Sequence, residues 1–195
     1  IVSPGFTSAS ITAAFACELF LSANAEDVRL AVAAGEPAGH VRAGSALELA
    51  DADDVELRVA FDFDGVLADD SSERVFSESG LDAFQSHEEN LAGSPHAPGP
   101  LQPLLARLAA IQAIEAAAEA QAGWTPRLKT ALVTARGAPA HERVITSLQH
   151  WGLRIDQSFF LGGVEKTAVL HALRPHIFFD DQKAHLDRAA PFVPA

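Results

Sequence analysis

Short apolar runs alternate with helix-like segments along most of this chain, and this alternation limits the folds that the chain can adopt. The apolar runs are residues 18–22, 59–63, 130–134, 158–161 and 176–179. Helix-like patterns cover residues 26–34, about 100–121, 139–151, 165–173 and 182–190. Strands without a polar face are typical of a parallel sheet that helices cover on both sides. The sequence therefore predicts an α/β fold with a parallel sheet and strand 59–63 at its centre.

Residues 70–126 interrupt this alternation. Their pattern is mostly helical, and the Pro- and Gly-rich stretch 94–100 marks a joint within them. An insertion directly after a strand can form a cap over the edge of the sheet. We therefore expect three parts, which are an N-terminal α/β segment at 1–57, a catalytic core at 58–69 and 127–195, and a cap insertion with a return helix at 70–126.

The N-terminal segment resembles the end of the chain. Residues 19–24 match residues 177–182, and each stretch is followed by a helix pattern and then Pro-Ala. The first stretch lacks the two Asp residues of the second. This pattern fits a decayed repeat, and it fits equally well two independent strand-helix units of a common type.

Charge and composition exclude some partners. The chain has 26 Asp+Glu against 14 Lys+Arg, a net charge of -12, and such a surface repels DNA and RNA polymers. The apolar stretch 11–21 is too short to span a bilayer, so we expect no membrane association. A single cysteine, Cys17, fits a reducing compartment, and a cytoplasmic location is expected. A homo-oligomer is compatible with the sequence. The chain starts at Ile1 and contains no Met, which suggests a trimmed or partial product.

Two acids stand at the end of strand 59–63. Asp62 is a candidate nucleophile, because a carboxylate can attack phosphorus and form an aspartyl-phosphate. Asp64 can protonate the leaving oxygen and later activate water, and its backbone carbonyl can bind a metal ion. Gly65 then allows a sharp turn. Acids after strands are also common turn residues, so this motif alone leaves both interpretations open.

A hydroxyl and two basic residues follow the next two strands. Thr134 can hydrogen-bond a phosphoryl oxygen, and Arg136 can contact the substrate or hold its own loop. Lys166 can offset charge on the nucleophile and on the transferred group. Each has an ordinary alternative, since Thr134 can cap a helix and a lysine early in a helix is often a surface charge.

The last apolar run ends in two acids, Asp180 and Asp181. Adjacent acids are costly to bury unless they are paired or bind a cation. Oxygen ligands suit Mg²⁺, so we expect a Mg²⁺ site made by the Asp62 carboxylate, the Asp64 carbonyl and one of these two acids, Asp181 in preference to Asp180. The alternative is an N-cap pair on the last helix.

The order of these motifs resembles that of the haloacid dehalogenase superfamily. The stretch from Arg58 to Asp181 further resembles the cytosolic 5′-nucleotidases of type I, in the segments LVTARGAPAHERVITSLQHWGLRIDQSFFLGG, HIFFDDQ, GLDAFQSHE and GPL. The N-terminal stretch LFLSANAEDVRLAVAAG resembles bacterial members. The resemblance implies a Rossmann-like parallel sheet with a small, mainly helical cap. It also implies Mg²⁺-dependent hydrolysis of nucleoside 5′-monophosphates through an aspartyl-phosphate.

The cap must recognise the nucleoside if the substrate is a nucleotide. Phe84 and His87, with Glu88 beside them in the cap segment, are candidates for stacking on the base and hydrogen-bonding to it. An ordinary amphipathic helix with Phe84 in a local core explains them equally well. Two other functions also stay open, a phosphatase for another small ester such as a sugar phosphate and a truncated nucleotide-binding relic without turnover.

Overall fold

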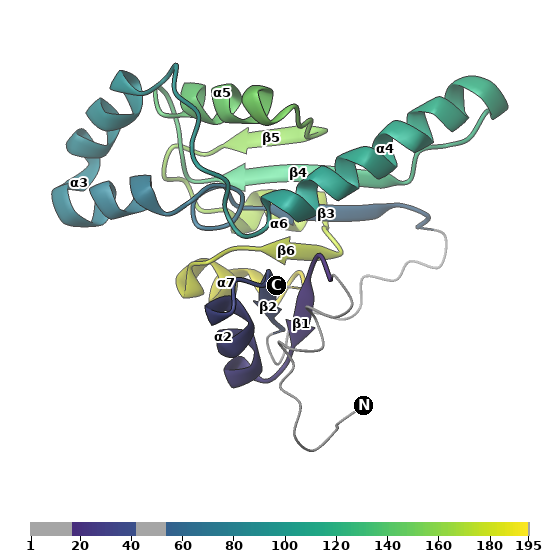
Figure 1. Ribbon diagram of the computed structural model, residues 1–195, viewed down its shortest axis with the longest axis horizontal. Coiled ribbons are helices and arrows are strands. Elements are labelled where there is room, and N and C mark those ends of the chain that lie inside the picture. Colours follow the sequence, from purple (N-terminus) through teal and green to yellow (C-terminus); the bar gives the residue numbers. More distant parts are fainter. Residues whose placement is uncertain (1–16, 42–53, 195) are drawn as a thin grey trace. The chain divides into compact units, whose positions relative to one another are not determined.

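Four parallel strands form the main sheet of this protein, whose computed structural model describes residues 17–41 and 54–194. They are β3 (Leu57–Phe61), β4 (Leu128–Thr134), β5 (Gln157–Phe160) and β6 (Ile177–Phe179). Their order in the sheet is β5-β4-β3-β6 (Figure 1). Phe61 pairs with Leu132 on one side and with Phe179 on the other. The strand predicted at the centre is therefore an inner strand. The end of β6 lies level with the end of β3, and β4 continues to Thr134, past the pair of Phe61 and Leu132.

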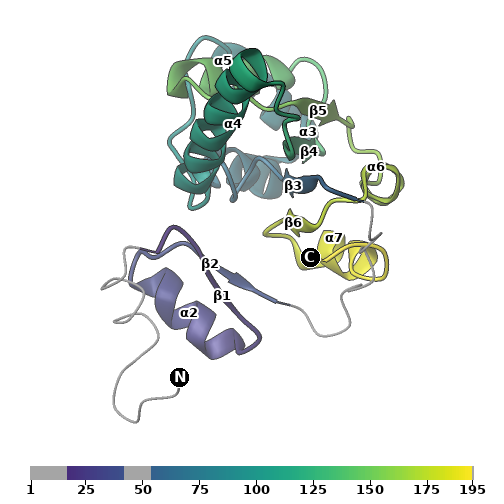
Figure 2. The same cartoon turned by 90° about the vertical axis from the view of Figure 1, so that its right-hand side faces the viewer.

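Helices cover both faces of this sheet, as the apolar runs predict. Figure 2 shows α4 (Gln102–Ala122) and α5 (His141–Trp151) on the opposite side from α6 (Thr167–Leu173) and α7 (Lys183–Ala189). Small and aromatic strand residues pack on the second pair of helices. The fully buried members of this core are Ala60, Ala131, Val133, Leu170, Phe178, Ala189 and Val193. The α/β fold with a parallel sheet is confirmed.

Two helices fill the insertion between β3 and β4. The first, α3 (Ser71–Asn90), is interrupted at Gly80, whose φ of 80° and ψ of -175° suit only glycine. The second, α4, has Pro in its first turn and ends at Gly123 in the left-handed conformation. The insertion is helical, as the sequence predicts, and α4 extends past the end of the strands (Figure 1).

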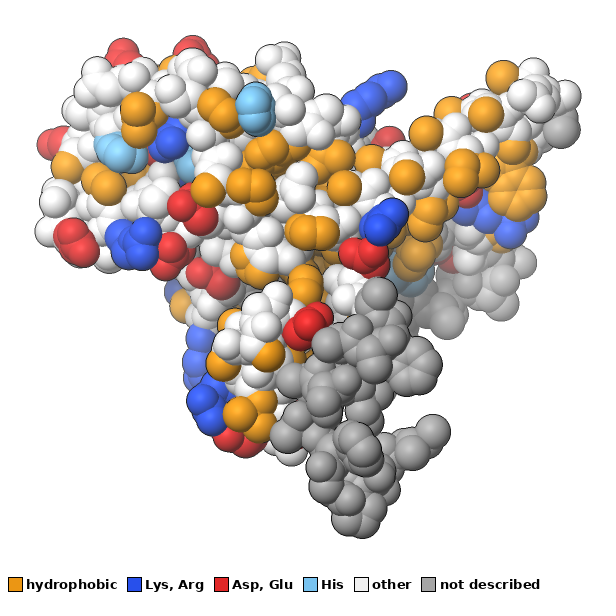
Figure 3. Space-filling model, in the orientation of Figure 1, with side chains coloured by type: hydrophobic (Ala, Val, Ile, Leu, Met, Phe, Trp, Pro, Cys, Tyr) orange, Lys and Arg blue, Asp and Glu red, His pale blue; other side chains and the backbone are white. Residues whose placement is uncertain are grey.

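The surface of α4 is partly apolar. Hydrophobic side chains follow this helix along its length in Figure 3; Ile111 and Ile114 on the helix are exposed, and so is Trp124, which follows it. None of the helices in the described ranges combines the length and the apolar character needed to cross a membrane.

The chain divides into two units, 1–44 and 45–195. In the first unit, β1 (Phe20–Ser22) pairs in parallel with β2 (Ala38–His40), and α2 (Ala25–Ala33) connects them. Asn24 caps α2, since its Oδ1 accepts a hydrogen bond from the backbone N–H of Glu26 at 3.0 Å. The sequence did not predict β2, because a three-residue run with a central glycine carries no strand pattern. The repeat hypothesis stays a prediction, and Ala195, the end of its second copy, lies outside the described residues.

Candidate active site

Asp62 continues directly from β3 into the interior. Its backbone N–H donates to the carbonyl of Phe179 at 2.8 Å, which extends the sheet by one residue. The side chain is buried, and Oδ2 forms an ion pair with Lys166 Nζ at 2.8 Å. Oδ1 is also buried, and it has no hydrogen-bond partner in the described part of the chain. An orphaned carboxylate oxygen of this kind is available to a cation or an electrophile.

Lys166 bridges two of the predicted acids. Its Nζ donates to Asp180 Oδ2 at 2.7 Å while it pairs with Asp62. Asp180 follows β6, and its other oxygen accepts from the backbone N–H of Gln182 at 2.8 Å, where α7 begins. Asp180 thus binds the lysine and the backbone of the residue that precedes α7, and its role as a metal ligand stays a prediction.

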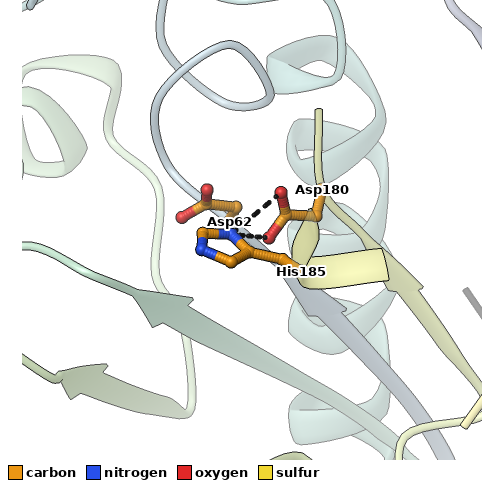
Figure 4. A group of neighbouring side chains, drawn as sticks. All are labelled: Asp62, Asp180 and His185. Carbon is orange, nitrogen blue, oxygen red and sulfur yellow. Dashed lines mark hydrogen bonds and ion pairs between the residues drawn. The ribbon is translucent and has the colours of Figure 1, made fainter. Parts of the chain in front are cut away.

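His185 also belongs to this group, although no sequence pattern predicted a role for it. Its Nδ1 lies 3.0 Å from Asp180 Oδ2. Ligand atoms of Asp62, Asp180 and His185 all lie within 4.8 Å of one another, and Figure 4 shows the three side chains at the ends of β3 and β6 and on α7. Because its Nδ1 faces a carboxylate, His185 is better suited to orient Asp180 than to bind a hard cation itself.

Carboxylates outnumber the lysine at this edge of the sheet. Burial, together with the charges on Asp180 and Asp64, raises the pKa of Asp62 to about 7, although Lys166 acts in the opposite direction. Burial and the neighbouring Asp180 raise the pKa of Asp181 to about 6. Burial would lower the pKa of Lys166, but Asp62 and Asp180 outweigh it and the pKa is raised. A further positive charge would relieve this excess.

Asp181 lies against the turn that follows Asp62, the candidate nucleophile. A Cβ placed on Gly65 would come within 2.4 Å of Asp181 Oδ2, and Gly65 has a φ of 68°. Glycine is therefore required here for both its conformation and its lack of a side chain. The oxygen-rich donor set, the orphaned Asp62 oxygen and the unbalanced charge fit a divalent cation such as Mg²⁺.

Arg136 holds Asp64 with two hydrogen bonds. Its Nε donates to Asp64 Oδ2 at 2.7 Å and its Nη2 donates to Oδ1 at 2.6 Å. Arg136 is buried, and its predicted contact with the substrate stays a prediction. Thr134 is buried as well, and its Oγ1 accepts from the backbone N–H of Arg136 at 3.3 Å.

Glycines bring the loops after β4 and β5 together. The N–H groups of Gly162 and Gly163 donate to the carbonyls of Arg136 and Ala135 at 3.1 and 2.8 Å. A Cβ on Gly137 would come within 2.7 Å of the Gly162 Cα. These contacts place the loop that leads to Lys166 directly beside the loop that follows Thr134.

The two candidate base-binding residues lie on α3. Phe84 is mostly buried, with its ring centroid 5.2 Å from the Arg136 guanidinium and 6.0 Å from the Phe76 ring. His87 is partly exposed, and its Nε2 lies 3.9 Å from Glu88 Oε1. Phe84 thus has packing partners in the protein itself, and the base-binding role of both residues stays a prediction.

The parallel sheet with acids and a lysine at its carboxyl edge is a fold of the haloacid dehalogenase type. The chain belongs to the 5′-nucleotidase family, whose model matches residues 2–195. It is similar to the human protein Cytosolic 5'-nucleotidase 1B, with 38% identity over 177 residues, 90% of this chain and 28% of that relative. The chain therefore spans little more than a quarter of that relative's length. No solved structure matches it. The resemblance to type I cytosolic 5′-nucleotidases is confirmed.

Proposed function

We propose that this chain carries the catalytic centre of a 5′-nucleotidase, which hydrolyses AMP-like nucleoside 5′-monophosphates to nucleoside and phosphate. The observation that supports this proposal is the environment of the two Asp62 carboxylate oxygens. One of them pairs with Lys166 at 2.8 Å, the other is buried without a hydrogen-bond partner among residues 17–41 and 54–194, and Asp64 stands two residues further on. The family membership and the name of the human relative support the choice of substrate.

In the first half-reaction, an oxygen of Asp62 attacks phosphorus and the bond from phosphorus to O5′ breaks. Asp64 gives a proton to O5′, so that the nucleoside leaves as a neutral alcohol. Lys166 offsets negative charge on the nucleophile and on the phosphoryl oxygens. The Thr134 hydroxyl hydrogen-bonds a phosphoryl oxygen. The product is an aspartyl-phosphate on Asp62.

In the second half-reaction, water attacks the phosphorus of this aspartyl-phosphate. Asp64, now deprotonated, accepts a proton from the water, and the bond from phosphorus to Asp62 breaks. Inorganic phosphate leaves, while Asp62 returns as a carboxylate and Asp64 as an acid. The net reaction consumes one ester and one water.

Mg²⁺ is the cofactor that we propose for this site. Asp62, the Asp64 backbone carbonyl and Asp181 would hold it, with Asp180 as the alternative acid. When bound, the cation neutralises charge on the phosphoryl group. Asp180 meanwhile pairs with Lys166 at 2.7 Å, which favours Asp181 as the direct ligand.

In this proposal, the insertion recognises the nucleoside. Residues 70–126 form the cap, and Phe84 and His87 contact the base, while the core parts 58–69 and 127–195 handle the phosphoryl group. A cytoplasmic location and a homo-oligomeric state belong to the same proposal.

Phosphate release from a panel of esters tests this function. Nucleoside 5′-monophosphates and sugar phosphates are compared with and without Mg²⁺, and Asp62→Asn serves as the inactive control. The proposal requires faster release from nucleotides than from sugar phosphates. A preference for sugar phosphates would indicate another small-ester phosphatase. Nucleotide binding without any release would indicate a non-catalytic relic.

A further inference from the structure

A second charged cluster lies between α3 and the loops that follow β3 and β4. Its members are all buried polar or charged side chains: Asp64, Ser72, Glu88, His96, Arg136, Arg143 and Ser147. They come from both ends of α3, from α5 and from the connecting loops. Only Asp64 has a task in the proposed reaction, so the other members need an explanation.

Arg136 divides its guanidinium between two acids in this cluster. Nε and Nη2 bind both oxygens of Asp64, and Nη1 pairs with Glu88. The aromatic rings of Phe63 and Phe84 each lie with their centroids 5.2 Å from the guanidinium carbon. Bonds in its plane and rings around it therefore fix the orientation of this guanidinium.

Glu88 anchors the other side of Arg136 and is fully buried. Its Oε1 accepts from Ser72 Oγ at 2.7 Å and from Arg143 Nη1 at 2.9 Å, and its Oε2 pairs with Arg136 and lies 3.4 Å from His96 Nε2. Burial would raise its pKa, but His96, Arg136 and Ser72 together hold the pKa of Glu88 well below its usual range. Glu88 is therefore a carboxylate.

Burying a cluster of charged side chains between helices has a large desolvation cost. Well-packed apolar side chains of similar volume often stabilise a protein as much as a buried ion pair does. The ion pairs add a fixed geometry, because the fork of Arg136 allows few positions for its two acids. Here one of those two acids is the group that transfers protons to and from the substrate.

We propose that Glu88 and Arg136 are positioning residues for Asp64. Glu88 on α3 sets the orientation of the guanidinium, and the guanidinium sets the orientation of the Asp64 carboxylate. The placement of α3 is thereby coupled to the placement of the proton-transferring group. This inference rests on the proposed function, in which Asp64 protonates the leaving oxygen.

The leaving group of the substrate separates this role from a purely structural one. Glu88→Gln keeps the size of the side chain and removes its charge. With AMP, whose alkoxide leaving group needs a proton, kcat should fall about tenfold or more, because a misplaced general acid loses part of its contribution to the rate. With p-nitrophenyl phosphate, whose leaving group needs little protonation, the rate of the first half-reaction, measured as the pre-steady-state burst of p-nitrophenol, should fall less than about threefold.

Glu89→Gln is the matched control, since Glu89 is the next residue of α3 and is exposed. It should change neither rate. Equal losses with both substrates in Glu88→Gln would show that the cluster only supports the fold, and would overturn the inference.

The same substitution in an Asp64→Asn background tests whether Glu88 acts through Asp64. If it does, Glu88→Gln should add less than about a twofold further loss with AMP, because the group that it positions has already lost its function. A further loss as large as that in the parent chain would overturn the inference.

Folding and the proposed function are checked separately. Should Glu88→Gln not fold, Arg136→Lys keeps the charge and loses the fork, and it should give the same split between AMP and p-nitrophenyl phosphate. Thermal unfolding verifies that each variant is folded. An unsubstituted chain without activity on either substrate would count against the proposed function. An active chain whose Glu88→Gln or Arg136→Lys variant slows both substrates equally would count against the positioning role alone.

Discussion

Asp62 and Asp64 are two residues apart, yet their surroundings differ. Asp62 faces Lys166, and within the described ranges its other oxygen has no hydrogen-bond partner, while both oxygens of Asp64 are bound by Arg136. The first arrangement leaves an atom available for attack. The second holds a carboxylate in place, which suits a group that only transfers protons. The two acids should therefore fail differently when they are replaced.

Asp62→Asn should abolish turnover with every substrate, by on the order of a thousandfold or more, because it removes the nucleophile. Asp64→Asn should lower kcat for nucleotides by about 100- to 10,000-fold, since general acid–base catalysis contributes that much. With an activated aryl phosphate the first step should partly survive in Asp64→Asn, and phosphate should accumulate on Asp62. Rapid quench followed by mass spectrometry measures the phosphorylated Asp62. Substantial activity in Asp62→Asn would contradict the covalent mechanism.

The raised pKa of Asp62 makes stability depend on pH in the metal-free chain. The pKa is about 7 in the folded chain against an ordinary value of 3.8, so the folded state holds more protons between these pH values. The free energy of unfolding should therefore decrease as pH rises from about 4 to about 7. Asp181, with a pKa of about 6, adds to the same trend.

Mg²⁺ should counter this loss, because it compensates the carboxylates that are charged at high pH. The rise in Tm on adding Mg²⁺ should be larger at pH 8 than at pH 5, as measured by thermal unfolding. Asp62→Asn should show a weaker pH dependence in the absence of metal. An equal rise at both pH values would argue against a cation at these acids.

Sequence patterns predicted which candidate residues lie together at the carboxyl edge of the sheet. Asp62 and Asp180 directly follow strands and Thr134 ends one, and parallel strands bring their carboxyl ends to one edge, so position along the chain translates into position in space. Glu88, Arg143 and His185 lie within helices, and their importance depends on which partners the tertiary fold places opposite them. No local pattern distinguishes a buried helical glutamate from the exposed Glu89 beside it.

At the level of elements, strands and helices were predictable to within a few residues where the pattern was strong. Helix 100–121 corresponds to α4 at Gln102–Ala122, since Pro and Gly mark its ends. The strand β2 was missed because it is short. The interruption of α3 at Gly80 was also missed, because a single glycine within a helical pattern usually leaves the helix continuous.

Two glycines with positive φ offer a matched comparison between a turn at the site and a helix break. Gly65 and Gly80 have φ of 68° and 80°, so alanine at either position is strained, by about 1–3 kcal/mol. Around Gly80 a Cβ meets no atom of the described residues within 4 Å, whereas at Gly65 it would displace the carboxylate of Asp181.

Both Gly65→Ala and Gly80→Ala should lower Tm, but only Gly65→Ala should weaken Mg²⁺ binding. Calorimetric titration of Mg²⁺ into the folded variants provides the measurement. If Gly65→Ala bound Mg²⁺ with unchanged affinity, Asp181 would not be a ligand whose position matters.

At the scale of the whole molecule, every residue assigned to the site lies in the second unit, 45–195. Four motifs spread over more than a hundred residues meet because one parallel sheet collects the ends of its strands. The first unit repeats the strand-helix pattern, but its Ser22 and Ala23 stand where the second unit has Asp180 and Asp181. It therefore offers no acids for a similar metal site at that position.

The second unit should accordingly carry the chemistry by itself. A chain of residues 45–195 should fold cooperatively, since it contains the four-stranded sheet with the helices on both of its faces. Its kcat for p-nitrophenyl phosphate should stay within about threefold of the full chain, because a unit with its own core keeps its own site geometry. Thermal unfolding and phosphate release, each measured on both chains, provide the test. A loss of more than about tenfold in a shortened chain that is still folded would mean that residues 1–44 supply part of the site. In that case the first unit would be a component of the active centre, and the similarity between the two strand-helix units would have a functional meaning.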